Sequence, residues 1–173
     1  MTLDDILPAA DERYHNNPLA VDLVERVLGT NFPAGYREFI ARFGGGVLAD
    51  FLRIFPPRRI LYSSTGVKEL RHPIDENWFW QQGAALLAET LGVETILLAD
   101  TKCGAELVFH LSTPNRIYAL SGDDDKMIYV AGDGFLPALE WVLTSGVLVE
   151  PGRALGFQPW DFKPWSIKQR RQR

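Results

Sequence analysis

Apolar residues three and four positions apart mark two helices in the first quarter of the chain. This spacing places side chains on one face of a helix. It predicts a helix that begins at Pro18, with Asn17 as its cap, and stops at Gly29. A second helix is predicted after Pro33 and ends at the three glycines 44–46, since its apolar residues Tyr36, Phe39, Ile40 and Phe43 repeat the same spacing.

Two further helices are predicted later in the chain. Residues 77–92 predict a helix that is irregular near Gly83. The last helix follows Asp133, which we expect to cap it, and ends at Gly146. Its apolar stripe consists of Phe135, Ala138, Leu139 and Val142.

Segments rich in β-branched and aromatic residues predict strands between these helices. Residues 47–57 predict one strand closed by two prolines, and residues 58–62 predict a second short strand. The second half of the chain predicts an antiparallel sheet, because short polar turns, including one at 113–115, join its apolar segments. These segments are 93–100, 105–112, 116–120 and 127–131.

Periodicity is lost after Gly146, where three prolines and two tryptophans occur within a short stretch. We expect an arm that packs through its aromatic residues, followed by a frayed tail. The predicted organisation is therefore one domain over residues 1–150 and a C-terminal aromatic arm with a basic tail over residues 151–173. The aromatic residues of the arm are Phe157, Trp160, Phe162 and Trp165.

Charge is distributed unevenly along the 173 residues. The formal net charge is −4, and residues 167–173 contribute four basic residues and no acidic one, which leaves −8 for residues 1–166. Affinity for phosphates comes mainly from lysine and arginine, so an acidic body argues against direct binding of nucleic acid. It favours a basic partner.

Composition narrows the class of protein further. Cys103 is the single cysteine, which excludes an intramolecular disulfide and a zinc cluster of thiolates. No apolar run reaches the roughly 18–20 residues that span a membrane. The acidic N-terminus lacks the features of a secretory signal. We therefore expect a soluble cytoplasmic protein.

The familiar motifs of catalysis are missing from the sequence, among them the P-loop, G-x-G-x-x-G, G-x-S-x-G and H-E-x-x-H. The glycines 44–46 are open to two interpretations: a helix end that turns into a strand, or a loop that cradles phosphate. Because phosphate loops precede a helix and these glycines follow one, the first interpretation is favoured.

Three features of the sequence are candidates for catalysis or metal binding. Cys103 lies in a predicted turn and His110 in a predicted strand, and a catalytic role for either needs a partner group nearby. Asp123, Asp124 and Asp125 form the densest acidic cluster, but their spacing does not match a calcium loop. We expect no metal and no cofactor, and we interpret the aspartates as a solvated turn or as a contact for a basic partner.

Residues 32–46, FPAGYREFIARFGGG, resemble the signature of the SUKH superfamily of Smi/Knr-type domains. Pro33, Tyr36, Phe39, Ile40, Phe43, Gly44 and Gly45 match that signature. Residues 94–111 are similar to the central hairpin of the family, and 128–143 to its closing strand and helix, so that the resemblance covers about residues 17–146. Gly104 is followed by Ala105 and Glu106, where the family often has Gly-Asp or Gly-Asn.

The resemblance implies an α+β fold with a mixed, mostly antiparallel sheet and helices packed against it. Many bacterial members of the family look like immunity proteins that bind and neutralise a toxin, often a nuclease. No catalytic residues come with the family.

The leading hypothesis is a non-enzymatic immunity protein whose acidic surface binds a cognate toxin with a basic surface. The predicted contact residues are Asp123, Asp124, Asp125 and Asp133, with Trp160 and Trp165 as further interface candidates, also for a possible homodimer. The alternatives are an intracellular regulatory or scaffold module, and an enzyme that uses Cys103, His110 or the aspartates.

Overall fold

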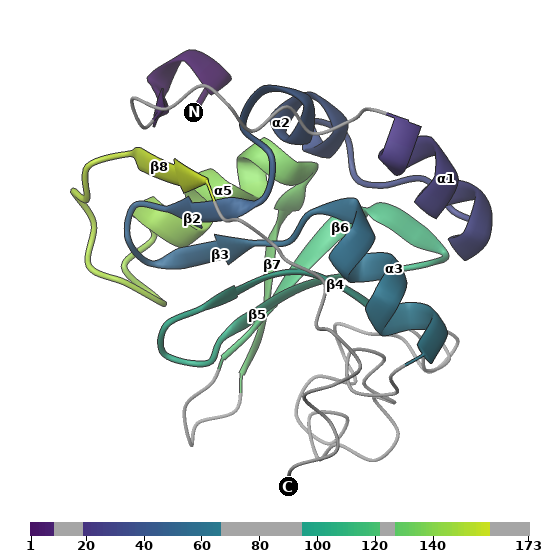
Figure 1. Ribbon diagram of the computed structural model, residues 1–173. Helices are drawn as coiled ribbons and strands as arrows, with labels where there is room; N and C mark the ends of the chain where they lie inside the picture. Colours follow the sequence, from purple (N-terminus) through teal and green to yellow (C-terminus); the bar gives the residue numbers. More distant parts are fainter. Residues whose placement is uncertain (9–18, 67–94, 122–126, 160–173) are drawn as a thin grey trace, which may run out of the picture.

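The computed structural model describes residues 1–8, 19–66, 95–121 and 127–159. Its centre is an eight-stranded sheet with the order β1-β8-β2-β3-β4-β5-β6-β7 (Figure 1). β1 and β8 pair in parallel, and the other neighbouring strands pair antiparallel. The strands are β1 (Leu7–Pro8), β2 (Gly46–Leu48), β3 (Leu52–Ile54), β4 (Thr95–Thr101), β5 (Glu106–His110), β6 (Thr113–Leu120), β7 (Ile128–Asp133) and β8 (Gly156–Pro159).

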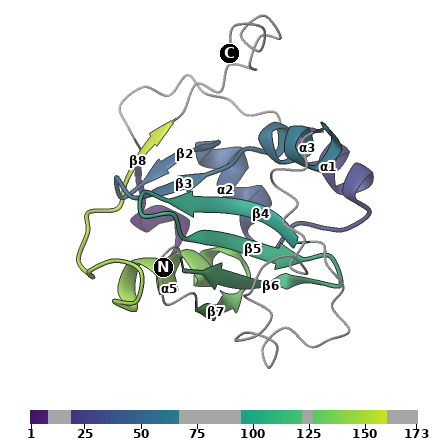
Figure 2. The same cartoon turned by 90° about the horizontal axis from the view of Figure 1, so that it is seen from below.

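Helices pack against this sheet: α2 lies behind β3 and β4 in Figure 2, and α5 lies against β6 and β7 at one end of the sheet. The predicted α+β class, with a mixed and mostly antiparallel sheet, is therefore confirmed. The helices of the described ranges are α1 (Leu19–Leu28), α2 (Tyr36–Phe43), α3 (Pro57–Gly66) and α5 (Phe135–Thr144), with a short 3₁₀ turn at Leu3–Asp5.

The core is organised around the apolar face of α2. Its four apolar residues are buried, as their spacing predicted. The Tyr36 ring stacks on Phe32 with 4.4 Å between centroids and meets Phe135 edge-on at 5.2 Å. Phe39 contacts Phe135 and Phe157 edge-on at 5.4 and 5.5 Å. One helix thus joins aromatic residues that come from four separate parts of the chain, in geometries that aromatic pairs prefer.

Tyr36 also makes a buried polar contact. Its hydroxyl donates a hydrogen bond to the backbone carbonyl of Phe55, with 2.6 Å between the oxygens. Burial raises the pKa of Tyr36 well above its ordinary value, because the low-dielectric surroundings disfavour a phenolate. The bond ties α2 to the segment that joins β3 to α3.

The glycines 44–46 allow elements to approach one another closely. Gly44 ends α2 with a positive φ of 76°, which favours glycine. A Cβ atom on Gly45 would lie 2.5 Å from Cδ of Pro56, and one on Gly46 would lie 2.3 Å from the carbonyl oxygen of Gln158 in β8. Packing against Pro56 and β8 therefore accounts for Gly45 and Gly46, as the interpretation of a helix end that turns into a strand predicted.

The prediction of one strand over residues 47–57 is wrong. β2 and β3 form a hairpin, and the chain turns at Ala49 and Asp50, which have positive φ values of 54° and 50°. The turn is closed by a hydrogen bond from the Phe51 N–H to the Leu48 carbonyl at 3.1 Å. Glycine, asparagine and aspartate are the usual residues of such a turn, so Asp50 fits it and Ala49 does not.

Two more local predictions are wrong. Residues 58–62 belong to the helix α3 and not to a strand, since Pro57 occupies the first helical position, where a proline sacrifices no hydrogen bond. The predicted turn at 113–115 is the start of β6, and the chain turns at Leu111 and Ser112 instead. Its antiparallel pairing with β5 places Thr113 opposite His110.

Asp133 does not cap the last helix. Gly134 holds the N-cap position of α5, and Asp133 is the last residue of β7. The Phe135 N–H donates to the Ala34 carbonyl at 2.7 Å, which ties the start of α5 to the loop before α2. The predicted helix at 77–92 lies outside the described residues, as do Asn17 and Pro18.

The C-terminal segment contributes a strand to the sheet. β8 pairs with β2 on one side and β1 on the other, so the two ends of the described chain meet. Phe157 is buried in the aromatic cluster, which confirms its expected packing role. The sheet thus includes residues 156–159 of the segment that the sequence set apart as an arm.

Replacing Gly46 by alanine is expected to lower the free energy of unfolding by about 3 kcal/mol, because the new methyl group would collide with the β8 backbone and the Phe157 ring. Urea unfolding measures this change. The matched control is Gly156→Ala, where nothing lies within 4 Å of the added carbon and the loss is expected to stay below about 1 kcal/mol. Equal losses for both variants would contradict the close-approach argument.

Replacing Tyr36 by phenylalanine is expected to cost about 2 kcal/mol, since a buried carbonyl loses its donor. The unfolded chain releases the tyrosine proton near pH 10, whereas the native state retains it. Wild-type stability therefore falls above pH 10 by up to about 1.4 kcal/mol per pH unit from this group. Urea unfolding between pH 8 and 11 should show the two proteins converging as the pH rises. A constant difference would rule out this origin of the pH dependence.

Candidate interaction surface

Asp133 is the one predicted contact residue that the structure describes. It lies at the end of β7, and Arg116 of β6 donates two hydrogen bonds to its carboxylate, at 2.9 and 3.1 Å. The hydrogen bond from Arg116 lowers the pKa of Asp133 below its ordinary value. Because the pair remains exposed, it is accessible to a partner, but its two charges compensate each other.

The other predicted contact residues lie outside the described residues, and their role stays a prediction. They are Asp123, Asp124, Asp125, Trp160 and Trp165.

Ion pairs cover much of the described surface. Arg37 binds both Asp22 and Glu25 at 2.6 Å. Isolated surface pairs of this kind contribute little to stability. In the described part of the chain, much of the negative charge expected from composition is therefore compensated by a basic group in direct contact. The other pairs are Asp4–Arg42, Asp50–Lys102, Asp100–Arg53, Asp133–Arg116 and Glu140 with the N-terminal ammonium.

Three loops lie side by side at one end of the molecule, at the left in both Figure 1 and Figure 2. We call residues 49–51, 102–104 and 145–155 the loop end. Lys102 joins the first two loops through its ammonium, 2.7 Å from Oδ1 of Asp50, and through its N–H, which donates to the Phe51 carbonyl. Arg153 of the third loop lies over the Phe51 ring, 5.2 Å from its centroid. Loops fixed in this way on a rigid sheet are suited to binding.

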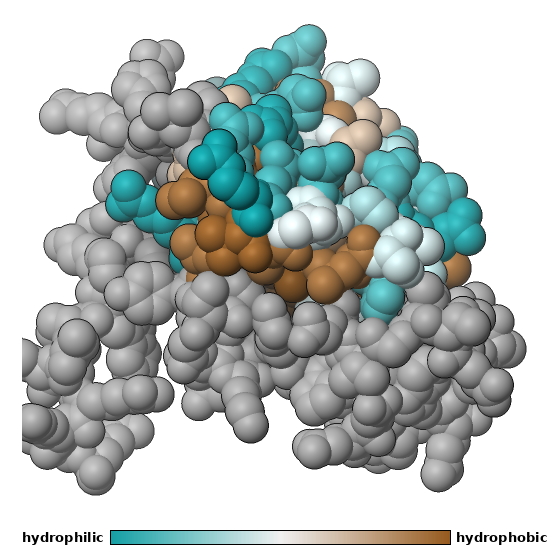
Figure 3. Space-filling model, turned by 90° about the vertical axis from the view of Figure 1, so that its right-hand side faces the viewer, coloured by the Kyte–Doolittle hydropathy of each residue, from teal (hydrophilic) through white to brown (hydrophobic). Residues whose placement is uncertain are grey.

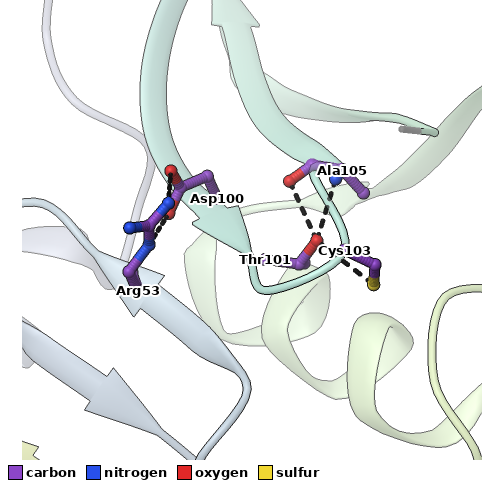
Figure 4. A network of polar contacts seen from close by, with 5 residues as sticks. All are labelled: Arg53, Asp100, Thr101, Cys103 and Ala105. Atoms are coloured by element: carbon purple, nitrogen blue, oxygen red, sulfur yellow. Dashed lines mark hydrogen bonds and ion pairs between the residues drawn. The ribbon is translucent and has the colours of Figure 1, made fainter.

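Polar contacts stiffen the turn between β4 and β5 (Figure 4). The Thr101 hydroxyl accepts a hydrogen bond from the Ala105 N–H at 2.9 Å and donates one to its carbonyl at 3.2 Å. At the base of this turn the Arg53 guanidinium binds the Asp100 carboxylate through Nε and Nη2. Cys103 is exposed at the tip, with its sulfur 3.6 Å from the Thr101 hydroxyl. Thr101 therefore fixes the β4–β5 turn from within, and the Arg53–Asp100 pair fixes it at its base.

The structure separates Cys103 and His110, two of the residues named for the enzymatic alternative. His110 lies opposite Thr95 at one end of the β4–β5 hairpin, and Cys103 lies in the turn at the other end. At about 3.3 Å per residue, roughly 15–20 Å lies between them. His110 is buried, and its Nδ1 accepts a hydrogen bond from the Ser112 N–H at 3.0 Å. The two therefore do not form a nucleophile and its base, and His110 is the hydrogen-bonded sheet residue that the sequence favoured.

Apolar side chains are exposed at separate places on the described surface. Leu23 and Val27 are half exposed on α1. Figure 3 views this side of the molecule and shows apolar residues gathered below a polar area. Met127 and Val130 are 42% and 38% exposed at β7, and Val147 is 45% exposed at the loop end. Exposed apolar residues of this kind are available to a protein partner.

Two searches of the described ranges were negative. No three histidine, cysteine, aspartate or glutamate side chains gather there in a way that could hold a metal ion. No helix in these ranges has the length and apolar character to cross a membrane.

The sequence did not predict the loop end. The turn at 101–104 was predicted, but its proximity to Asp50 and Arg153 depends on the pairing of β2, β3 and β4. Because residues 47–57 were predicted as one strand, the sequence carried no signal that Asp50 lies in a turn beside Lys102.

Comparison with protein-family models found a match to the SMI1 / KNR4 family (SUKH-1) over residues 17–135. Searches of curated proteins and of solved structures found no significant match. The matched segment runs from just before α1 to the first residue of α5, and it contains the aromatic face of α2 and the glycine turn.

Replacing Arg116 by alanine is expected to raise the pKa of Asp133 towards the ordinary value of an aspartate, because its largest lowering cause is the Arg116 hydrogen bond. Carboxyl chemical shifts followed by NMR between pH 2 and 7 report this titration. Arg153→Ala is the control, since this arginine belongs to the loop end. An unchanged Asp133 pKa in Arg116→Ala would show that the pair does not form in solution.

Proposed function

The chain belongs to the SMI1 / KNR4 family (SUKH-1), and on this basis we propose that it is a non-enzymatic immunity protein. It acts in the cytoplasm and neutralises a cognate bacterial toxin by binding it directly. The family match carries this proposal, because it covers the chain from α1 to β7, including the aromatic face of α2 and the glycine turn.

The surface supports a binding role. The loop end combines exposed side chains of both charges with the apolar Val147, and contacts within and between its loops hold it in place. Such preorganisation lowers the entropy lost on binding. Fold alone names no partner, since one fold serves many functions.

The proposed mechanism is steric and electrostatic. Acidic side chains of this chain meet the basic groove of a toxin, such as the groove with which a nuclease binds phosphates, and the bound protein blocks access to the toxin's site. Asp133 and the aspartates 123–125 are the proposed acidic contacts. Because Arg116 already binds Asp133, a basic group of the toxin either displaces Arg116 or binds the carboxylate beside it.

Co-expression with the toxin encoded beside the gene tests the proposal. Growth should be restored, and the two proteins should purify together. If the toxin kills regardless and no complex forms, the proposal is wrong. A chain that binds a host protein with no toxin gene beside it would instead be a regulatory or scaffold module.

The electrostatic contact is tested with the triple variant Asp123→Asn, Asp124→Asn, Asp125→Asn. We expect association with the toxin at low salt to be about tenfold slower, because charges near an interface steer encounter. The control carries Asp4→Asn, Glu38→Gln and Glu140→Gln, which change the net charge equally at exposed positions outside the loop end. Stopped-flow association rates at two salt concentrations separate the variants. Equal rates for both would assign the effect to net charge alone.

A further inference from the structure

The third loop of the loop end, residues 145–155, lies beyond the segment that matches the family, which ends at residue 135. The first two loops, 49–51 and 102–104, lie within that segment. The loop end therefore joins a part that the family model covers to a part outside it. Because connecting loops vary more than the elements they join and often carry binding residues, the third loop is suited to selecting one partner.

Arg153 is the basic residue of this third loop, and it is exposed. Its guanidinium carbon lies 5.2 Å from the ring centroid of Phe51, and the face of an aromatic ring attracts a cation at this distance. Among the residues that the structure describes, none holds Arg153 through a hydrogen bond or an ion pair. The arginines 37, 42, 53 and 116, in contrast, each bind a carboxylate. Arg153 therefore keeps its N–H groups available for another molecule.

The Phe51 ring is a fixed platform for this arginine. Phe51 is 5% exposed, its N–H donates to the Leu48 carbonyl at 3.1 Å, and its carbonyl accepts a hydrogen bond from the Lys102 N–H at 3.2 Å. The turn before it includes Ala49 at a positive φ of 54°, which alanine adopts only where the surrounding contacts impose it. An arginine on a fixed ring loses less conformational freedom when it binds, so Arg153 is preorganised.

The charges around Arg153 indicate what kind of group it binds. The Asp50 carboxylate is bound by Lys102 at 2.7 Å, and its pKa lies below the ordinary value through that hydrogen bond first and also through the nearby charge of Arg153. One carboxylate thus faces two cations. Glu150 is a further exposed acidic residue of the third loop. Two carboxylates repel a polyanion such as nucleic acid, whereas a single carboxylate fits the planar fork of one guanidinium.

We propose that Arg153 binds an aspartate or glutamate side chain of the toxin through two parallel hydrogen bonds, with the Phe51 ring behind it. Val147, 45% exposed in the same loop, contacts apolar residues beside that carboxylate. Arg153 is thereby a specificity-determining residue, because a toxin without the carboxylate leaves the guanidinium unpaired in the interface. This inference rests on the proposed function, since the carboxylate belongs to the toxin.

The test measures the Kd of the full chain for a catalytically inactive form of the toxin encoded beside the gene. For Arg153→Ala we expect the Kd to rise about 30-fold, because charge-assisted hydrogen bonds are lost. Arg153→Lys keeps the charge but not the fork, so its Kd should rise about tenfold. The matched control is Arg26→Ala, an exposed arginine of α1 that likewise has no ion pair within the described ranges, with a Kd expected within about threefold of wild type. Circular dichroism and thermal unfolding verify that each variant is folded.

A charge exchange identifies the carboxylate. Arg153→Glu places two like charges opposite each other and should raise the Kd by at least about 100-fold. Each exposed aspartate and glutamate of the toxin is then replaced by lysine and paired with this variant. One of these replacements should restore binding to Arg153→Glu and weaken binding to the wild-type chain.

Three results would overturn the inference while the proposed function stands. The first is wild-type affinity in Arg153→Ala and Arg153→Glu. The second is wild-type affinity in Arg153→Lys, which would assign the effect to positive charge alone. The third is binding of a single-stranded oligonucleotide by the free protein that Arg153→Ala abolishes, which would assign the arginine to a phosphate. Absence of any complex between the toxin and the wild-type chain would refute the proposed function itself.

Discussion

The hydrogen bond between the Tyr36 hydroxyl and the Phe55 carbonyl fixes the relation between α2 and the sheet. Phe55 is bound to the sheet through its N–H, which donates to the Leu98 carbonyl of β4 at 2.9 Å. The ring of Tyr36 meanwhile packs between Phe32 and Phe135. One side chain thus aligns a helix, two strands and the start of α5, and a buried polar group in such a place specifies one arrangement because alternatives leave it unsatisfied.

Close approach at the glycine turn is the second constraint, and it follows from the first. α2 delivers the chain to Gly46 beside β8, with no room for a side chain there. β8 then places Phe157 against Phe39 and Phe43, so that the strand closes the same aromatic cluster that α2 opens. Since β8 also pairs with β1, the sheet is completed by residues from both ends of the described chain.

Sequence reasoning succeeded where one local rule decided the structure and failed where tertiary contacts did. The spacing of Tyr36, Phe39, Ile40 and Phe43 is enough to predict α2 and its buried face. The turn at Ala49 and Asp50 has only a weak sequence signal, because aspartate tolerates a positive φ whereas alanine adopts one only where the surrounding contacts impose it. Residues 58–62 were predicted as a short strand, but packing of α3 against α1 favours a helix.

The same distinction applies to the candidate surface. Net charge suggested an acidic face, yet seven acidic side chains of the described ranges already hold a cation, so total charge does not measure what is offered to a partner. A partner that approaches these pairs must exchange one ion pair for another, with little net gain. The contacts that each charge already makes therefore say more about a binding surface than the number of charged residues does.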